Sequence, residues 1–483
     1  VLAMGITILA GCGGGGSSGS PEPTIDLEYT DIPNKVVMVE FTGPTAEVNF
    51  TGLNNAEIYM IRMNLSASHA TNFEVGSLQS ISVEGLSPDP FPYAEPQTTS
   101  TVNFPYAHIP PLEFEEPQDI PIFQNIMPLS EPNVSDTRLF FISPTLTPGN
   151  WALRTATLCA KGTHAYVWVE NTHIGTETGQ INCSASNNEA QKMSNWFDKI
   201  HPVETALLGN EYEGKGPQTG IDGDPRVHIY IYDIGNAAGY FWGKDLYSKS
   251  AYYGSNAAEM IYMDLGYIKD YTDSFAPLTL IHEYQHLINF TRKGNTTAWY
   301  TELLSTMVSD VIGTHPDVNI PYARYNNPWH YLSASPSYNA ASYMEWEYGD
   351  SLDYRNVYIL GTYLARNYSG AAFIRAVLDN GYKDHASIGA ALHEIRPAEF
   401  TSNYMENLLK AFARMGEALV FTETGYPLSI NNVNREISSS VKGYTYTFYP
   451  LDIANRPNSL PVKTEPFATS DFISTQNIFS NYY

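Results

Sequence analysis

Residues 273–291, DSFAPLTLIHEYQHLINFT, constrain the fold more than any other part of the chain. Pro277 suits the first turn of a helix, and either Asp273 or Ser274 can cap its start. Apolar residues then recur at helical spacing: Leu280, Ile281, Leu287 and Ile288. The segment therefore predicts a helix that is buried in the protein core.

Two histidines and a glutamate interrupt this apolar pattern. His282 and His286 are four residues apart, so on a helix they are offset by about 40° and present their imidazoles from adjacent turns of one face. Such a pair can bind one zinc ion, and Glu283, about 100° round from His282, can hold and deprotonate a metal-bound water. We therefore predict a zinc site with Glu283 as the catalytic base. The alternative is a structural helix whose histidines are satisfied by hydrogen bonds, without metal.

A catalytic zinc ion usually has three protein ligands and one open position. Here a loop around residues 293–295 would reverse the chain, and a second helix beginning near residues 296–299 would carry Glu302 back past the imidazoles. We predict Glu302 as the third ligand. The alternative is an exposed carboxylate in the first helical turn, where the helix dipole favours negative charge.

This region resembles the hyicolysin-type zinc metallopeptidases. In that family HExxH is followed by the pattern W-x-x-E-x-x-S, which Trp299, Glu302 and Ser305 match. The likeness covers roughly residues 145–380. It implies an α+β fold with a zincin-like metallopeptidase domain, a mixed sheet plus active-site helices, and endopeptidase activity on proteins or peptides with Zn2+ as cofactor.

Two departures from the family pattern concern the pocket and not the ligands. Leu303 stands where a small Gly commonly follows the ligand Glu, and Tyr300-Thr301 replace an apolar-plus-Asn pair. They leave the shape of the pocket open, and the donor to the oxyanion is open too. Three residues lie in the right stretch to supply that donor, although each tyrosine more often serves packing: Tyr354, Tyr358 and His330.

The chain divides into four predicted parts. Residues 1–24 resemble a bacterial lipoprotein signal with a Gly/Ser tether, in which Cys12 would carry the lipid; an apolar strand is the alternative for the first residues. Residues 25–140 predict a small β-sandwich with a Pro-rich linker, residues 141–430 the metallopeptidase domain, and residues 431–483 a β-rich segment. The expected location is extracytoplasmic, on the membrane or cell surface.

Charge and cysteine content narrow the partners. A formal net charge of −25 disfavours nucleic acid, because the protein would repel phosphate. Cys159 and Cys183 form either a disulfide or two free thiols. Asp222 and Asp224 form either a calcium site or, as we favour, an ordinary acidic turn. The oligomeric state is not determined by the sequence.

A second function of a different class fits the same sequence. The chain could be a surface-displayed binding or adhesion lipoprotein whose metallopeptidase domain is inactive and structural. The intact ligand types and the intact Glu283 argue against this alternative.

Overall fold

The computed structural model describes the following residues: 2–9, 24–28, 36–40, 47–51, 56–63, 109–115, 131–211, 220–235, 237–321, 323, 344, 346, 351–420 and 436–449. Cys12 and His330 lie outside these ranges, so the predicted lipid site and one candidate oxyanion donor stay predictions.

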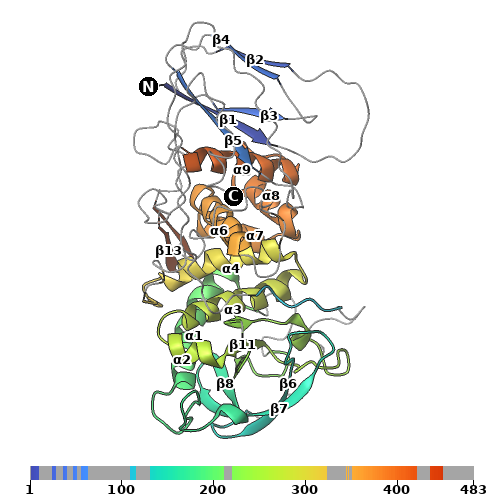
Figure 1. Ribbon diagram of the computed structural model, residues 1–483, viewed down its shortest axis with the longest axis vertical. Coiled ribbons are helices and arrows are strands. Elements are labelled where there is room, and N and C mark those ends of the chain that lie inside the picture. The colour runs from blue at the N-terminus through green and yellow to red at the C-terminus, as the bar shows by residue number, and fades with distance from the viewer. Residues whose placement is uncertain are drawn as a thin grey trace, which may run out of the picture.

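Six strands form a mixed sheet at one end of the molecule (Figure 1). In spatial order they are β10 (Gly239–Tyr240), β11 (Met260–Asp264), β9 (Val227–Tyr232), β8 (Ala165–Glu170), β7 (Ala152–Lys161) and β6 (Thr137–Ile142). The three central strands β11, β9 and β8 are parallel, and the outer pairs are antiparallel. Their sequences MIYMD, VHIYIY and AYVWVE are buried throughout, as is typical of strands that are covered on both faces.

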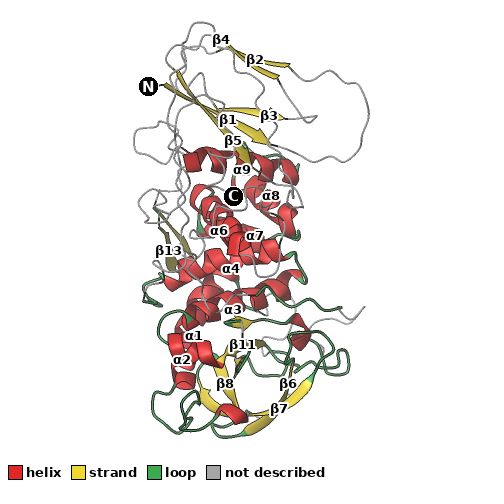
Figure 2. Cartoon of the chain, in the orientation of Figure 1, coloured by secondary structure: helices red, strands yellow, loops and turns green. Residues whose placement is uncertain are grey.

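Helices pack on this sheet and on one another (Figure 2). They are α1 (Glu189–Leu208), α2 (Leu265–Tyr271), α3 (Ala276–Lys293), α4 (Ala298–Gly313), α6 (Ser351–Asn367), α7 (Ala371–Asp379), α8 (Asp384–Ile395) and α9 (Tyr404–Val420). α1 contacts β7 and β8, and α3 contacts β10 and β11. α4 then packs between α3 and α6. The α+β class is therefore confirmed. None of the described helices combines the length and apolar character that a bilayer crossing requires.

The start of α3 corrects one detail of the prediction. The helix begins at Ala276 with Pro277 in its first turn, as expected, but the residue before it is Phe275, and no side chain caps it. Asp273 instead binds Lys192 Nζ at 2.6 Å. The Ser274 hydroxyl donates to the Tyr271 carbonyl at 3.4 Å, so both predicted caps make other hydrogen bonds.

Shorter strands stand outside the main sheet. β1 (Leu2–Leu9) pairs in parallel with β3 (Val36–Glu40) and β5 (Ala56–Met63), and β2 (Thr24–Glu28) pairs in parallel with β4 (Glu47–Thr51). The predicted β-sandwich is not confirmed by these pairs. The lipoprotein signal predicted for residues 1–24 stays a prediction. β12 (Ile437–Val441) and β13 (Tyr444–Phe448) form a hairpin.

The domain boundaries stay predictions, although two contacts bear on how the parts join. β6 spans residue 141 and belongs to the main sheet. The hydroxyl of Tyr446, on the C-terminal hairpin, donates to the Val203 carbonyl of α1 at 2.7 Å. The hairpin therefore packs directly on the helices around the sheet.

A disulfide joins Cys159 on β7 to Cys183, in the loop before α1, with their Cα atoms 4.9 Å apart. Of the two alternatives that the sequence left open, a disulfide and two free thiols, the structure contains the disulfide. Such a bond persists in oxidising compartments.

Candidate metal centre

A tight turn brings α4 back along α3. α3 ends at Lys293, and Gly294 follows with a φ of 71°, a region that glycine adopts with little strain. The backbone and side chain of Thr297 then both donate to Asp384 Oδ1 at 2.9 Å, which holds the start of α4 in place. The helical hairpin that the sequence predicted is therefore present.

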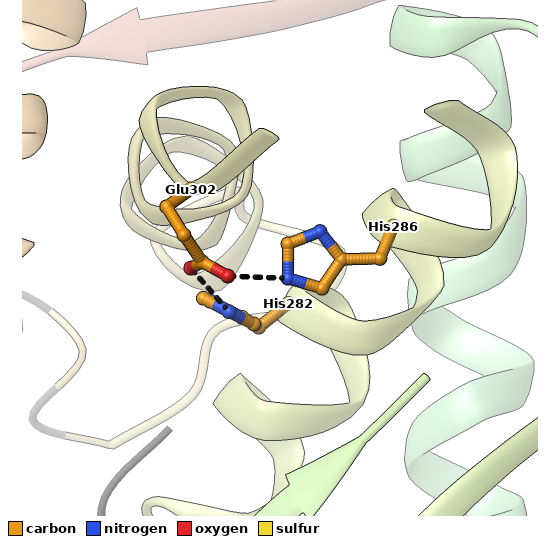
Figure 3. Close-up of side chains that lie close together, drawn as sticks. All are labelled: His282, His286 and Glu302. Carbon is orange, nitrogen blue, oxygen red and sulfur yellow. Dashed lines mark ion pairs between the residues drawn. The ribbon is translucent and has the colours of Figure 1, made fainter. Parts of the chain in front are cut away.

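Three predicted ligands meet between these two helices (Figure 3). His282 Nε2 lies 3.0 Å from Glu302 Oε2, and His286 Nε2 lies 3.1 Å from Glu302 Oε1. All three side chains are at most 1% exposed. Their candidate ligand atoms lie within 4.8 Å of one another, and within the described part of the chain no second group of three His, Cys, Asp or Glu residues does so.

The electrostatics of this group fit a bound cation. His286 Nε2 and Glu302 Oε1 are buried and face each other without a hydrogen bond. Burial would raise the pKa of Glu302, but the neighbouring charges of His286 and His282 outweigh it and hold the pKa below its usual value. Burial lowers the pKa of His286, although Glu302 opposes this, which favours the neutral ring that metals bind. Two imidazoles and a carboxylate are a donor set that suits zinc.

Thr301 orients one of the two histidines. Its Oγ1 lies 2.8 Å from His286 Nδ1 and also accepts from Asn289 Nδ2 at 3.4 Å. When His286 donates its Nδ1–H to this hydroxyl, the lone pair on Nε2 faces Glu302 and the metal position. The sequence marked Thr301 only as a departure from the family pattern; its position directly before the ligand glutamate was the available signal.

Ser305 contacts the other histidine and the carboxylate. Its Oγ lies 3.3 Å from His282 Nε2 and donates to Glu302 Oε2 at 3.2 Å. Trp299, one turn before Glu302, is 3% exposed and packs edge-on against Tyr300. Of the W-x-x-E-x-x-S pattern, Glu302 thus belongs to the buried group, Ser305 contacts it, and Trp299 is buried one turn earlier on the same helix.

Glu283, the predicted base, is fully buried on the same helix. Burial raises its pKa well above the usual value, and the nearby charge of Glu302 acts in the same direction. The backbone amide of Phe241 opposes both by favouring the charged carboxylate. Phe241 directly follows β10, and no local motif marks this residue as one that acts on Glu283.

The candidate oxyanion donors differ in their surroundings. The ring of Tyr354 lies 6.4 Å from that of His282 and 4.7 Å from that of Trp346. The hydroxyl of Tyr358 donates to Asp310 Oδ2 at 3.1 Å, which is a packing contact between α6 and α4. Of the two described tyrosines, Tyr354 is therefore the one beside the candidate metal ligands.

In the acidic turn before β9, the carboxylates bind neighbouring side chains of the protein. Asp222 Oδ2 lies 3.0 Å from His228 Nε2, and Asp224 accepts from the hydroxyl of Tyr166 at 2.5 Å and from Arg226 at 3.0 Å. These contacts agree with the favoured interpretation of an ordinary turn.

Comparison with known proteins supports a metallopeptidase. No family model matches the chain. The neutral metalloprotease ShpI of Staphylococcus hyicus is 26% identical to it over 312 residues. The alignment covers 59% of this chain and 64% of the relative. A metallopeptidase relationship agrees with the buried group of His282, His286 and Glu302, which fits a metal ion.

Proposed function

We propose that the chain is a zinc-dependent endopeptidase that hydrolyses proteins or peptides outside the cytoplasm. The observation that carries the proposal is the convergence of three buried donors, His282, His286 and Glu302, from two consecutive helices. These two imidazoles and one carboxylate would hold a zinc ion with three protein ligands, the number typical of catalytic zinc sites. The similarity to a neutral metalloprotease supports a peptide bond as the target.

Within this site Glu283 transfers a proton from the attacking water to the leaving amine. Zinc, when bound, supplies a Lewis acid that activates water and polarises a peptide carbonyl. Glu283 accepts the proton from the water and passes it to the leaving amine nitrogen. Burial raises its pKa, which is the direction that helps Glu283 hold the proton before passing it on.

The proposed location outside the cytoplasm is supported by the disulfide between Cys159 and Cys183. We further propose that a lipid on Cys12 anchors the chain to the membrane. Intact-mass analysis of protein from the membrane fraction tests this, and a Cys12→Ser variant that still partitions into detergent would refute it.

A Glu283→Gln variant tests the mechanism. We expect it to retain about one zinc per chain, as in the wild type, and to lose casein cleavage by a factor of about 10² to 10⁴. Glu204→Gln is the matched control, because Glu204 is also a fully buried glutamate on a helix but lies outside the ligand group. Casein cleavage by Glu283→Gln at the wild-type rate would exclude Glu283 as the base.

The same experiment distinguishes the proposed peptidase from the alternative function given above. A wild-type protein that binds zinc but cleaves neither casein nor a proteome-derived peptide library would favour the inactive, surface-displayed binding protein. A protein without zinc would favour a structural helix.

A further inference from the structure

Residues 109–115, IPPLEFE, lie against the free edge of the main sheet, and we name them the strap. β10 is the end strand of that sheet. Ala238 accepts from Asp264 of β11 at 3.0 Å, so by strand alternation Phe241 turns its backbone groups away from β11. Leu112 of the strap donates its N–H to this outward Phe241 carbonyl at 3.4 Å. In Figure 1 the strap is the short teal segment beside α3.

Phe241 also connects the strap to the reaction centre. Its amide acts on the buried carboxylate of Glu283, while its carbonyl accepts from Leu112. The strap backbone is therefore hydrogen-bonded to the residue that directly follows β10, a strand that packs on α3.

An aromatic pocket receives one side chain of the strap. The ring of Phe114 lies 5.8 Å from Tyr247, 5.4 Å from Tyr252 and 5.9 Å from Phe290, measured between centroids. Phe290 is one helical turn beyond His286 on α3. We name Tyr247, Tyr252 and Phe290 the aromatic pocket; Phe290 lies on the helix that carries the histidine ligands, and the two tyrosines precede β11 in the chain.

Two prolines prepare the strap for this position. Pro110 and Pro111 fix their own φ near about −65° and bias the residues before them toward extended backbone. Ordering such a segment costs less conformational entropy than ordering a free chain. Pro110 is buried, and Ile109, Leu112 and Phe114 are partly buried against the core.

These contacts are those by which an extended peptide is bound at a sheet edge. Main-chain hydrogen bonds supply affinity, and pockets for alternate side chains supply selectivity. In the strap, Leu112 supplies the main-chain bond and Phe114, two residues later, fills the pocket. A segment of the same chain is present at a high effective concentration, so it competes strongly with a free peptide.

We propose that the strap occupies the substrate edge as an internal inhibitor, and that the aromatic pocket binds an aromatic side chain of an extended peptide substrate. The inference rests on the proposed peptidase function for its substrate. Release of the strap exposes both the Phe241 carbonyl and the aromatic pocket.

Binding of a free strap peptide tests this without requiring catalysis. A fluorescein-labelled IPPLEFE peptide is titrated with the full-length, zinc-loaded protein and followed by fluorescence polarisation. We expect Phe114→Ala to bind it at least about tenfold more tightly than the wild type, because the pocket is then vacated. Leu112→Pro removes the N–H donor and provides a second variant with the same expectation. Glu113→Ala is the matched control, since Glu113 is exposed within the strap.

A control peptide, IPPLEAE, tests the aromatic pocket itself and should bind Phe114→Ala about tenfold more weakly than IPPLEFE. Equal binding of IPPLEFE by the wild type, Phe114→Ala and Leu112→Pro would overturn the proposal. Casein cleavage is measured in parallel and should rise about tenfold in Phe114→Ala. Tighter peptide binding without cleavage in any variant would refute the peptidase function while leaving the strap at its edge.

Discussion

Replacing Thr301 with valine removes one hydroxyl and preserves the shape of the side chain. In the wild type this hydroxyl lies 2.8 Å from His286 Nδ1. Without it, a buried N–H on His286 loses its partner, which costs about 1–3 kcal/mol. Loss of a partner to a metal-binding histidine typically weakens metal affinity by about 10- to 100-fold. We therefore expect Thr301→Val to raise the zinc dissociation constant by that factor.

The assay is competition for zinc with a chromophoric chelator at fixed pH, together with kcat/KM on a peptide substrate at saturating zinc. Thr301→Ser keeps the hydroxyl and should stay within about threefold of the wild type in zinc affinity. Thr306→Val is the matched control, since the Thr306 hydroxyl donates to the backbone carbonyl of Glu302 at 2.7 Å and touches no histidine. Zinc affinities of Thr301→Val and Thr306→Val that agree within about twofold would refute the orienting role of Thr301.

Three further predictions concern stability. Replacing both Cys159 and Cys183 with alanine should lower the free energy of unfolding by about 2–4 kcal/mol, measured by urea denaturation; an unchanged value would mean that the bond does not restrict the unfolded chain. Burial, aided by the charge of Glu211, raises the pKa of Glu204 well above its usual value, so the folded state keeps this proton to higher pH than the unfolded state. Stability from Glu204 is then complete below the usual glutamate pKa and falls as pH rises, by up to about 1.4 kcal/mol per pH unit. We measure the free energy of unfolding of Glu204→Gln by urea denaturation from pH 4 to 8 (about one point per pH unit) and expect this decrease to be absent. A variant whose free energy of unfolding varies with pH as in the wild type would contradict the prediction. Removing zinc with a chelator should abolish cleavage and lower the free energy of unfolding by about 4 kcal/mol if free zinc is 1,000-fold above its Kd; identical melting of the apo and zinc-loaded proteins would contradict this.

The helix that carries the histidines could be predicted because its signals are local. Pro277 sets the first turn and Gly294 allows the reversal that starts α4, so both ends of the hairpin lie close in sequence to the residues they position. His282, His286 and Glu302 followed from helical periodicity plus one short turn.

Other parts of the site could not be predicted because they depend on tertiary packing. The approach of Phe241 to Glu283 requires β10 to take the edge of the sheet next to α3, and strand order is not encoded in any short motif. Leu112 and Phe241 are in contact but lie far apart in the sequence, because most strands of the sheet come between them along the chain. The Pro-rich composition around Leu112 indicated a linker, and composition alone does not reveal what an extended linker packs against.

The N-terminal strands show a related limit. Strand-like segments in residues 25–140 predicted a β-sandwich; strands β2 to β5 are present there, but the parallel pairings of β1 with β3 and β5 were not foreseen. Period-two patterns specify which side chains share a face and leave the pairing partner open.

The most direct test of the metal centre is anomalous X-ray diffraction from crystals of the zinc-loaded protein, with data collected on both sides of the zinc absorption edge. The account predicts one strong peak about 2.0–2.2 Å from His282 Nε2, His286 Nε2 and a carboxylate oxygen of Glu302. A peak elsewhere, or one bound by both histidines with Glu302 turned away, would contradict it.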